Sequence, residues 1–118
     1  MIKLGNNQLE SNDYNYLTGH GKQRITERIG RRLPKTPEQQ ASLAWRFGLS
    51  QENLSGGLFR WVDRRRIKFP GKIQLIYKKY LFVFSKEAPH KVITVYPVPN
   101  KFHGDCNRLE KKKRKNNL

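Results

Sequence analysis

Three consecutive runs of β-branched and aromatic residues, joined by short connections, most constrain what this chain can fold into. The runs are KIQLIY, YLFVFS and KVITVYPV, at residues 72–77, 80–85 and 91–98. Such residues favour strands, and short connections join neighbouring strands that run in opposite directions. Residues 65–69 have the same strand-like period before the turn signal at Pro70 and Gly71. The second half of the chain therefore predicts an antiparallel meander of three or four strands.

Two helices are predicted ahead of the strands. The first covers residues 18–30 and follows the capping residue Thr18. The second covers residues 36–48 and has Pro37 at its first helical position, behind a capping threonine. A third helix or an irregular turn is expected over residues 51–65. Helices followed by a meander predict an α+β fold, with the N-terminal helices packed on one face of the sheet.

Composition divides the 118 residues into three regions. We expect an N-terminal arm over residues 1–17, a single α+β domain over residues 18–100 and a basic C-terminal tail over residues 101–118. Strict alternation along the last strand places Ile93 and Val95 on one face of the sheet. The opposite face, predicted to be a working face rich in tyrosine and phenylalanine, would carry Val92, Thr94 and Tyr96.

The charge of the chain predicts a polyanionic partner. Lys and Arg number 25 against 9 Asp and Glu, a net charge of +16, which exceeds what solubility requires and repels itself in the folded state. RNA or DNA is the partner that fits best. No segment has the pattern of a membrane-spanning or membrane-lying helix. The chain has one cysteine and no apolar leader near its start, so a cytoplasmic location is expected.

The motifs that would indicate a metal or a cofactor are missing. His103 and Cys106 form a single pair, and zinc requires three or four ligands. The chain contains no glycine-rich phosphate loop and no nucleophile elbow. We therefore expect no metal and no cofactor, which leaves general acid–base chemistry as the catalytic option.

The first predicted helix carries charge where a core-facing stripe would normally lie. At about 100° per residue, one face of this helix carries an imidazole, a carboxylate and two guanidinium groups, which belong to His20, Glu27, Arg24 and Arg31. The guanidinium group of Arg28 lies beside this stripe. The apolar face is thin and consists of Ile25 and Ile29. Such a stripe could hold a phosphate and move a proton. The alternative is a solvated face of ion pairs.

Metal-independent RNA cleavage needs few components. A base removes the 2′-hydroxyl proton, cations stabilise the pentacoordinate phosphate and an acid protonates the leaving oxygen. His20 or Glu27 could transfer the proton, and Arg24 and Arg28 could contact the phosphate. The candidates for binding RNA are further basic, aromatic and hydroxyl side chains: Arg31, Arg64, Arg65, Arg66, Tyr77, Thr94, Tyr96, Lys111, Lys112, Lys113, Arg114 and Lys115.

The order of these features resembles small single-domain proteins of the barnase/RelE-like ribonuclease superfamily. The resemblance covers roughly residues 18–99 and rests on a last strand that reads VITVY and on a helix of the form His-x3-Arg-x2-Glu-Arg, here His20, Arg24, Glu27 and Arg28. It implies RNA cleavage on an exposed sheet face by a toxin whose partner is an acidic antitoxin or immunity protein. Relatives commonly keep a catalytic Tyr, Lys or His after the last strand, where this chain has Lys101 and His103.

Three functions stay open at this point. The first is a metal-independent endoribonuclease or ribonuclease-derived toxin. The second is a noncatalytic nucleic-acid-binding accessory protein of a phage or mobile element, and the third is a small basic inhibitor that binds an acidic protein surface. A carboxylate among arginines favours the first over the second, because a protein that only binds nucleic acid has no need of Glu27.

Overall fold

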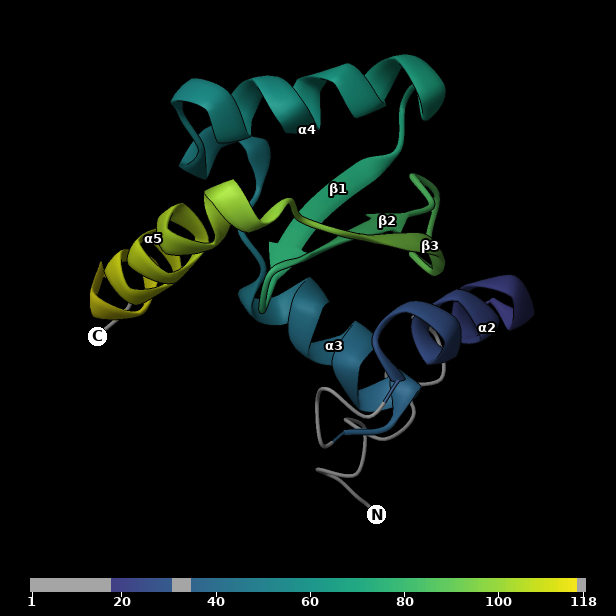
Figure 1. The fold of residues 1–118 in the computed structure, drawn as a ribbon. Coiled ribbons are helices and arrows are strands. Elements are labelled where there is room, and N and C mark those ends of the chain that lie inside the picture. Colours follow the sequence, from purple (N-terminus) through teal and green to yellow (C-terminus); the bar gives the residue numbers. More distant parts are fainter. Residues whose placement is uncertain (1–17, 31–34, 117–118) are drawn as a thin grey trace.

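The computed structural model describes residues 18–30 and 35–116, so the predicted arm and Arg31 lie outside the described residues. Within residues 18–30 and 35–116 the fold has four helices and three strands (Figure 1), with the short 3-10 turns η2 (Gln51–Asn53) and η3 (Asn100–Phe102). In chain order they are α2 (Gly19–Arg28), α3 (Pro37–Phe47), α4 (Gly56–Lys68), β1 (Ile73–Tyr77), β2 (Tyr80–Phe84), β3 (Val92–Pro97) and α5 (His103–Asn116). No helix in the described part of the chain is both long and apolar enough to cross a membrane.

The predicted meander is confirmed. The strands lie in the order β1-β2-β3, and both pairs are antiparallel. Residues 65–69 do not join the sheet, which corrects the strand predicted there. They form the end of α4, where the Phe69 N–H donates to the Arg65 carbonyl at 3.0 Å. The backbone of these residues already forms hydrogen bonds within the helix, so it is not available to pair with a strand.

The N-terminal helices pack on one face of the sheet, as expected. Their buried side chains meet the aromatic residues of β2 in one core cluster, which includes Ile25, Ile29, Ala41, Ala44, Phe82 and Phe84. Both predicted caps are present: the Thr18 hydroxyl accepts from the Gly21 N–H, and Thr36 forms a capping box with Gln39. These caps fix where α2 and α3 begin, and therefore which of their faces meet the strands.

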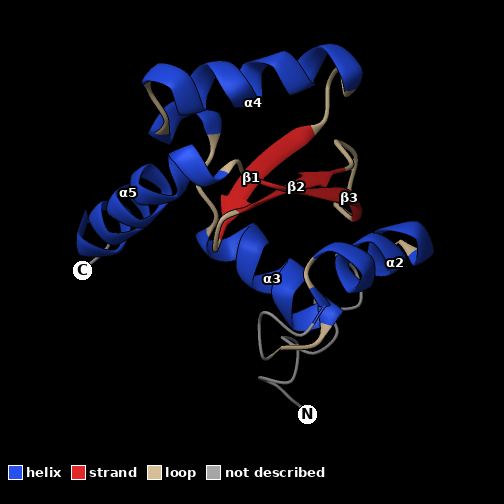
Figure 2. Cartoon of the chain, in the orientation of Figure 1, coloured by secondary structure: helices blue, strands red, loops and turns tan. Residues whose placement is uncertain are grey.

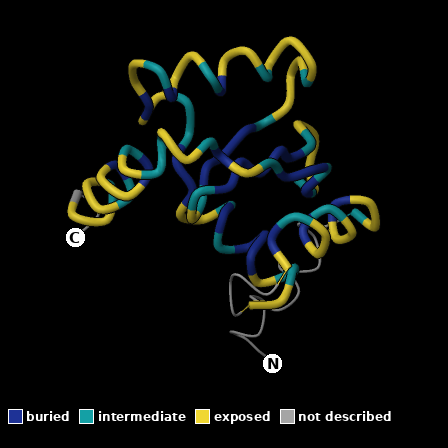
Figure 3. Tube along the Cα trace, viewed as in Figure 1, coloured by how far each residue is buried: buried dark blue, intermediate teal, exposed yellow. Residues whose placement is uncertain are grey.

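The other face of the sheet, predicted to be an exposed working face, is largely covered by helices as well. A second core cluster joins α4 and α5 to the strands through residues that include Leu58, Val62, Ile76, Leu81, Cys106 and Leu109. The strands therefore lie between two pairs of helices (Figure 2), and the buried part of the chain runs through the middle layer (Figure 3). Only the parts of this face that α4 and α5 leave open can meet a ligand.

The helix α5 also moves the boundary of the domain. The sequence predicts a separate tail from residue 101, but Cys106 and Leu109 are buried in the second cluster. They are three residues apart, so they share one face of a helix. The folded unit therefore extends at least to Leu109, and the basic residues that follow continue the same helix.

A bulge in β3 changes which side chains share a face. Val83 pairs with Thr94, but Phe84 pairs with Val92, so Ile93 is an extra residue on β3. Val92 and Val95 consequently enter the same cluster under α2 and α3. The predicted alternation, which placed Val92 with Thr94 and Tyr96, is wrong at Val92 for this reason.

Candidate nucleic-acid interface

The helix α2 lies directly against the edge strand β3. The Thr18 hydroxyl donates to the Val92 carbonyl at 2.9 Å, and Ile25 and Ile29 are buried beneath the helix. A side chain at Gly21 would overlap the Val92 carbonyl oxygen. This close approach turns the opposite, charged side of α2 outward.

The predicted stripe on α2 is a surface network. Arg24 Nε donates to His20 Nε2 at 3.2 Å, and Arg24 Nη1 donates to Glu27 Oε1 at 3.0 Å. The side chains of Arg24 and Glu27 are 32% and 46% exposed, and His20 is exposed. The structure therefore brings three of the four stripe residues together in contact with solvent, while the fourth, Arg31, lies outside the described residues.

The hydrogen bonds of the stripe define what it can do chemically. Bonds from Gln23 and Arg24 hold the pKa of the Glu27 carboxyl below its usual value, so this side chain stays ionised and cannot donate a proton, and it is a weaker base than an ordinary carboxylate. His20 Nε2 accepts a bond from Arg24, so it becomes available as a base when that bond opens. Arg24 is then free to turn toward a phosphate.

The side chain of Arg28 points away from the stripe and contacts β3. Its Nη1 donates to the Val95 carbonyl at 2.6 Å and lies 3.5 Å from Thr94 Oγ1, and its guanidinium carbon is 4.8 Å from the centre of the Tyr96 ring. The predicted catalytic group of four is therefore divided between two places. The direction of Arg28 follows from its position beside the apolar face of α2 rather than at the centre of the charged one.

Two cations from the end of α4 meet Arg28 at the same ring. The guanidinium carbon of Arg65 lies 4.4 Å from the centre of the Trp61 ring and 6.0 Å from the centre of the Tyr96 ring. Lys68 Nζ lies 5.7 Å from the centre of the Tyr96 ring. We call this group the Tyr96 cluster, and it comprises Arg28, Arg65, Lys68, Thr94 and Tyr96. Lys68 was missed in the sequence, although its spacing of three from Arg65 would place the two together on a continued α4.

The Tyr96 cluster concentrates positive charge at a partly exposed aromatic ring. None of its three cations forms an ion pair within residues 18–30 and 35–116. The neighbouring Arg66, also predicted to bind nucleic acid, points elsewhere and contacts Asp63 and Gln51 at 3.5 and 3.3 Å. Arg64 is exposed, with no contact to the cluster. Of the three consecutive arginines, Arg65 is the one that the described contacts place at the Tyr96 ring.

Tyr77, which the sequence grouped with Thr94 and Tyr96, faces the other layer. Its partner across the hairpin is Tyr80, and both pack with the cluster under α2 and α3. Tyr96 pairs with Leu81 and packs with the α4 and α5 cluster. Burial and the Glu110 carboxylate raise the pKa of the Tyr77 hydroxyl, so it remains a neutral hydrogen-bond donor.

The predicted basic run is the second half of α5. Lys113 is partly buried, and its Nζ donates to the Gly48 carbonyl at 2.6 Å. The other four side chains of the run are exposed: Lys111, Lys112, Arg114 and Lys115. The run is thus fixed to the domain at one residue and open to a ligand at the others.

The remaining reactive groups have structural partners. Burial raises the pKa of the Cys106 thiol to about 11, so it stays protonated and is a poor nucleophile. Of the two residues near the end of the sheet that the resemblance singled out, His103 lies with Nε2 2.7 Å from the Val98 carbonyl. Lys101 is exposed and lies 5.2 Å from the Phe102 ring. Neither approaches the His20 network through a described contact.

Known proteins give no lead to the chemistry of these surfaces. Comparison of the chain with protein-family models, with curated proteins and with solved structures finds no match. Within the described ranges, no three His, Cys, Asp or Glu side chains are grouped so that they could hold a metal ion. Membership of the ribonuclease superfamily therefore stays a prediction from the motifs, and what the surfaces can do follows from their own chemistry.

Proposed function

We propose that this protein binds RNA and that the Tyr96 cluster is a principal contact. The observation that carries the proposal is the meeting of Arg28, Arg65 and Lys68 around one partly exposed tyrosine ring, with no ion pair to a described carboxylate. Like charges repel, so such a group is costly unless an anion joins it. A phosphate is the anion that matches both its charge and its donors.

The donors of the cluster suit a phosphodiester. Of the five N–H groups of a guanidinium, only those on Nη1 of Arg28 have a described partner. The rest can form charge-assisted bonds to phosphate oxygens, and Arg65 and Lys68 add two further cations from α4. The ring between them is partly exposed, so a base could contact it. Unstacked bases are characteristic of single-stranded RNA, which favours RNA over duplex DNA.

The second candidate function is metal-independent RNA cleavage, and the α2 network favours it. His20 and Glu27 could remove the 2′-hydroxyl proton, while Arg24, which contacts both, could stabilise the charge on the phosphate. An acidic antitoxin or immunity protein is the partner that this activity implies, because such a protein would neutralise the same cations. In the noncatalytic alternative, the protein binds RNA but does not cleave it.

Incubation with total RNA in EDTA separates the two candidates. If α2 catalyses cleavage, the wild-type protein should degrade RNA without a metal. His20→Ala should then slow the reaction by about 10²–10⁴-fold, as loss of a general acid or base does. The melting temperature should stay unchanged, because His20 is exposed and its removal leaves no cavity.

Lys22→Ala is the matched control for this experiment. Lys22 is on the same helix and is 60% exposed, but it points away from the network and pairs with Glu38 at 3.5 Å. The control should cleave RNA at the wild-type rate. Intact RNA with the wild-type protein, or equal cleavage by His20→Ala and wild type, would reject catalysis by α2 and leave the noncatalytic function.

A further inference from the structure

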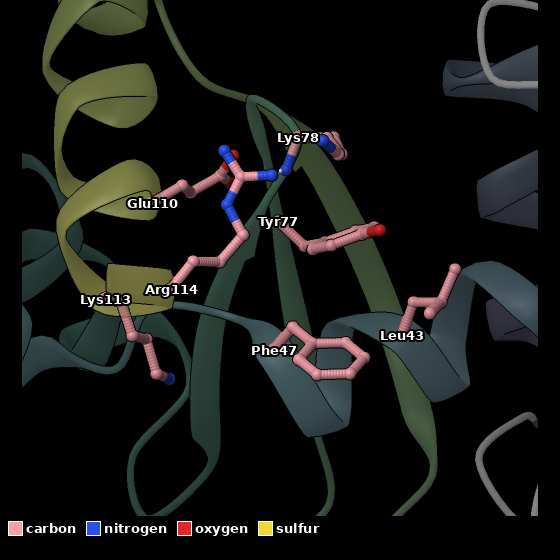
Figure 4. Close-up of a pocket in the computed structure, with 7 residues that line it drawn as sticks. All are labelled: Leu43, Phe47, Tyr77, Lys78, Glu110, Lys113 and Arg114. Carbon is pink, nitrogen blue, oxygen red and sulfur yellow. Dashed lines mark hydrogen bonds between the residues drawn. The ribbon is translucent and has the colours of Figure 1, made fainter. Parts of the chain in front are cut away.

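A groove with an apolar end and a basic end lies between α3, the β1–β2 turn and α5. Its apolar end is a pocket of about 230 Å³, lined by residues that include Leu43, Phe47, Tyr77 and Arg114. Figure 4 shows the Phe47 and Tyr77 rings beside this pocket, with Arg114 reaching across from α5. A neighbouring pocket of about 640 Å³ shares Lys78, Glu110 and Arg114 with it and forms the basic end. We call the two pockets together the α5 groove.

The walls of the α5 groove are held in place before any ligand arrives. Below it, Cys106 and Leu109 fix α5 to the core. At its rim, Glu110 Oε2 accepts the Lys78 backbone N–H at 2.8 Å, and Lys113 Nζ donates to the Gly48 carbonyl at 2.6 Å. A preformed site loses less conformational freedom on binding, which favours affinity.

The β1–β2 turn carries a backbone conformation that needs an explanation. Lys78 and Lys79 have φ values of 49° and 71°, in the left-handed region where a two-residue hairpin turn usually has Asn and Gly. Lysine is strained there, so the pair costs stability. What it contributes is two ammonium groups at the tip of the hairpin, on the wall of the α5 groove.

The charges around the groove are mostly unpaired. Lys79, Lys111 and Arg114 form no hydrogen bond or ion pair through their side chains within the described ranges. Arg108 pairs with Asp105 at 3.1 Å. Glu110 is the carboxylate that lines both pockets, and one of its oxygens is already occupied by the turn. The basic end is therefore suited to several phosphate groups in a row.

The apolar end is suited to one flat ring. Phe47 is 50% exposed, which is unusual for a phenylalanine, and it lies with Leu43 and Tyr77 at the pocket. The volume of about 230 Å³ is below the about 300–1,000 Å³ of sites for drug-sized ligands, so it suits a group the size of one nucleobase. A base and the phosphates that flank it would match the two ends of the groove.

We propose that the α5 groove binds a single-stranded segment of RNA, with one base against Phe47 and its phosphates along the basic end. This inference rests on the proposed RNA binding and deepens it by assigning a second contact site, one that takes a single-stranded segment. The bases of a duplex are stacked on one another and cannot enter the pocket, whereas single strands offer them to aromatic side chains. The groove therefore discriminates single strands from duplexes.

The experiment compares Phe47→Ala with Phe59→Ala. Phe59 lies on α4, is 36% exposed and lines neither pocket, so it is the matched control. Fluorescence anisotropy measures the affinity of each variant for a labelled oligouridine and for an RNA duplex of the same length. Loss of one stacked base should weaken oligouridine binding about 5- to 150-fold in Phe47→Ala. Duplex binding, and both affinities of Phe59→Ala, should equal those of the wild type.

A second substitution keeps the test sound if Phe47→Ala does not fold. Phe47→Leu keeps apolar contact with Leu43 and removes only the aromatic face, so it should give the same loss at a wild-type melting temperature. If the wild type binds oligouridine and the Phe47 variants bind it equally well, the α5 groove is not an RNA site. An acidic protein partner in the groove would give that same result. If the wild type binds no RNA at all, the proposed function fails as well.

Discussion

Replacing Arg65 and Lys68 together by glutamate should weaken RNA binding by about 100-fold or more. Each charge-assisted hydrogen bond contributes about 1.5–3 kcal/mol, and about 1.4 kcal/mol is a tenfold change in affinity. Two such bonds to phosphate would be lost, and two carboxylates would be placed beside Arg28 at the Tyr96 ring. Anisotropy with a labelled single-stranded RNA at low salt measures the loss.

The control for this prediction is Arg64→Glu with Arg66→Glu. The two residues lie on the same helix and are exposed, and the double substitution changes the net charge by the same amount. Neither residue contacts the Tyr96 ring, so only the general attraction should fall and the loss should be much smaller. Equal losses in the two double variants would show that RNA responds to total charge and that the Tyr96 cluster is no particular contact.

Gly21→Ala should destabilise the fold strongly, by about 1–3 kcal/mol, the usual cost of forcing a methyl group into a packed interface. The added Cβ would overlap the Val92 carbonyl oxygen, and that oxygen is backbone of a paired strand, so it cannot move aside as a flexible side chain would. Helix α2 would have to move away from β3 and pull Ile25 and Ile29 from the core. Thermal or urea unfolding followed by circular dichroism measures the change.

Gly19→Ala provides the comparison on the same helix. A Cβ at Gly19 would meet no atom within 4 Å. Alanine has the higher helix propensity, so this variant should be as stable as the wild type or slightly more stable. If Gly21→Ala were equally stable, α2 would not lie against β3 as described, and the outward direction of the His20 network would lose its basis.

Local signals made much of the fold predictable from the sequence. The three strands were recognised because each run is rich in β-branched and aromatic residues and the connections are short. The starts of α2 and α3 were recognised because Thr18 and Thr36 are strong capping residues in front of helical patterns. These features depend only on neighbours in the chain, which is the information that a single sequence holds.

Features set by distant contacts were not predictable. The bulge at Ile93 is visible only in the pairing of β3 with β2. Over residues 103–115, α5 has two buried side chains in a very basic run, so its packing depends on a surface that α4 and the strands supply. Residues 65–69 alternate like a strand, and only the continued hydrogen-bond ladder of α4 decides between strand and helix.

The candidate site was predicted in its residue types but not in its arrangement. The sequence placed His20, Arg24 and Glu27 on one side of α2, because the wheel of one helix depends only on its own sequence. It left open whether that side is exposed or buried, and the exposure is a finding of the structure. Three features depend on how α2, α4 and the sheet meet. Arg28 points to the sheet, Arg65 is the one of three arginines at the Tyr96 ring, and Tyr77 and Tyr96 face opposite layers. A single sequence does not state those contacts.

The salt dependence of RNA binding tests the central claim most directly. A labelled single-stranded RNA is titrated with the wild-type protein at several salt concentrations from about 50 to 200 mM, the range over which counterion release changes affinity strongly. The logarithm of the association constant should fall linearly with the logarithm of salt concentration, by about 0.7 for each phosphate neutralised on a single strand. The slope should be shallower when Arg65 and Lys68 are replaced by glutamate. A flat slope, or no binding at the lowest salt, would contradict RNA recognition by these cations.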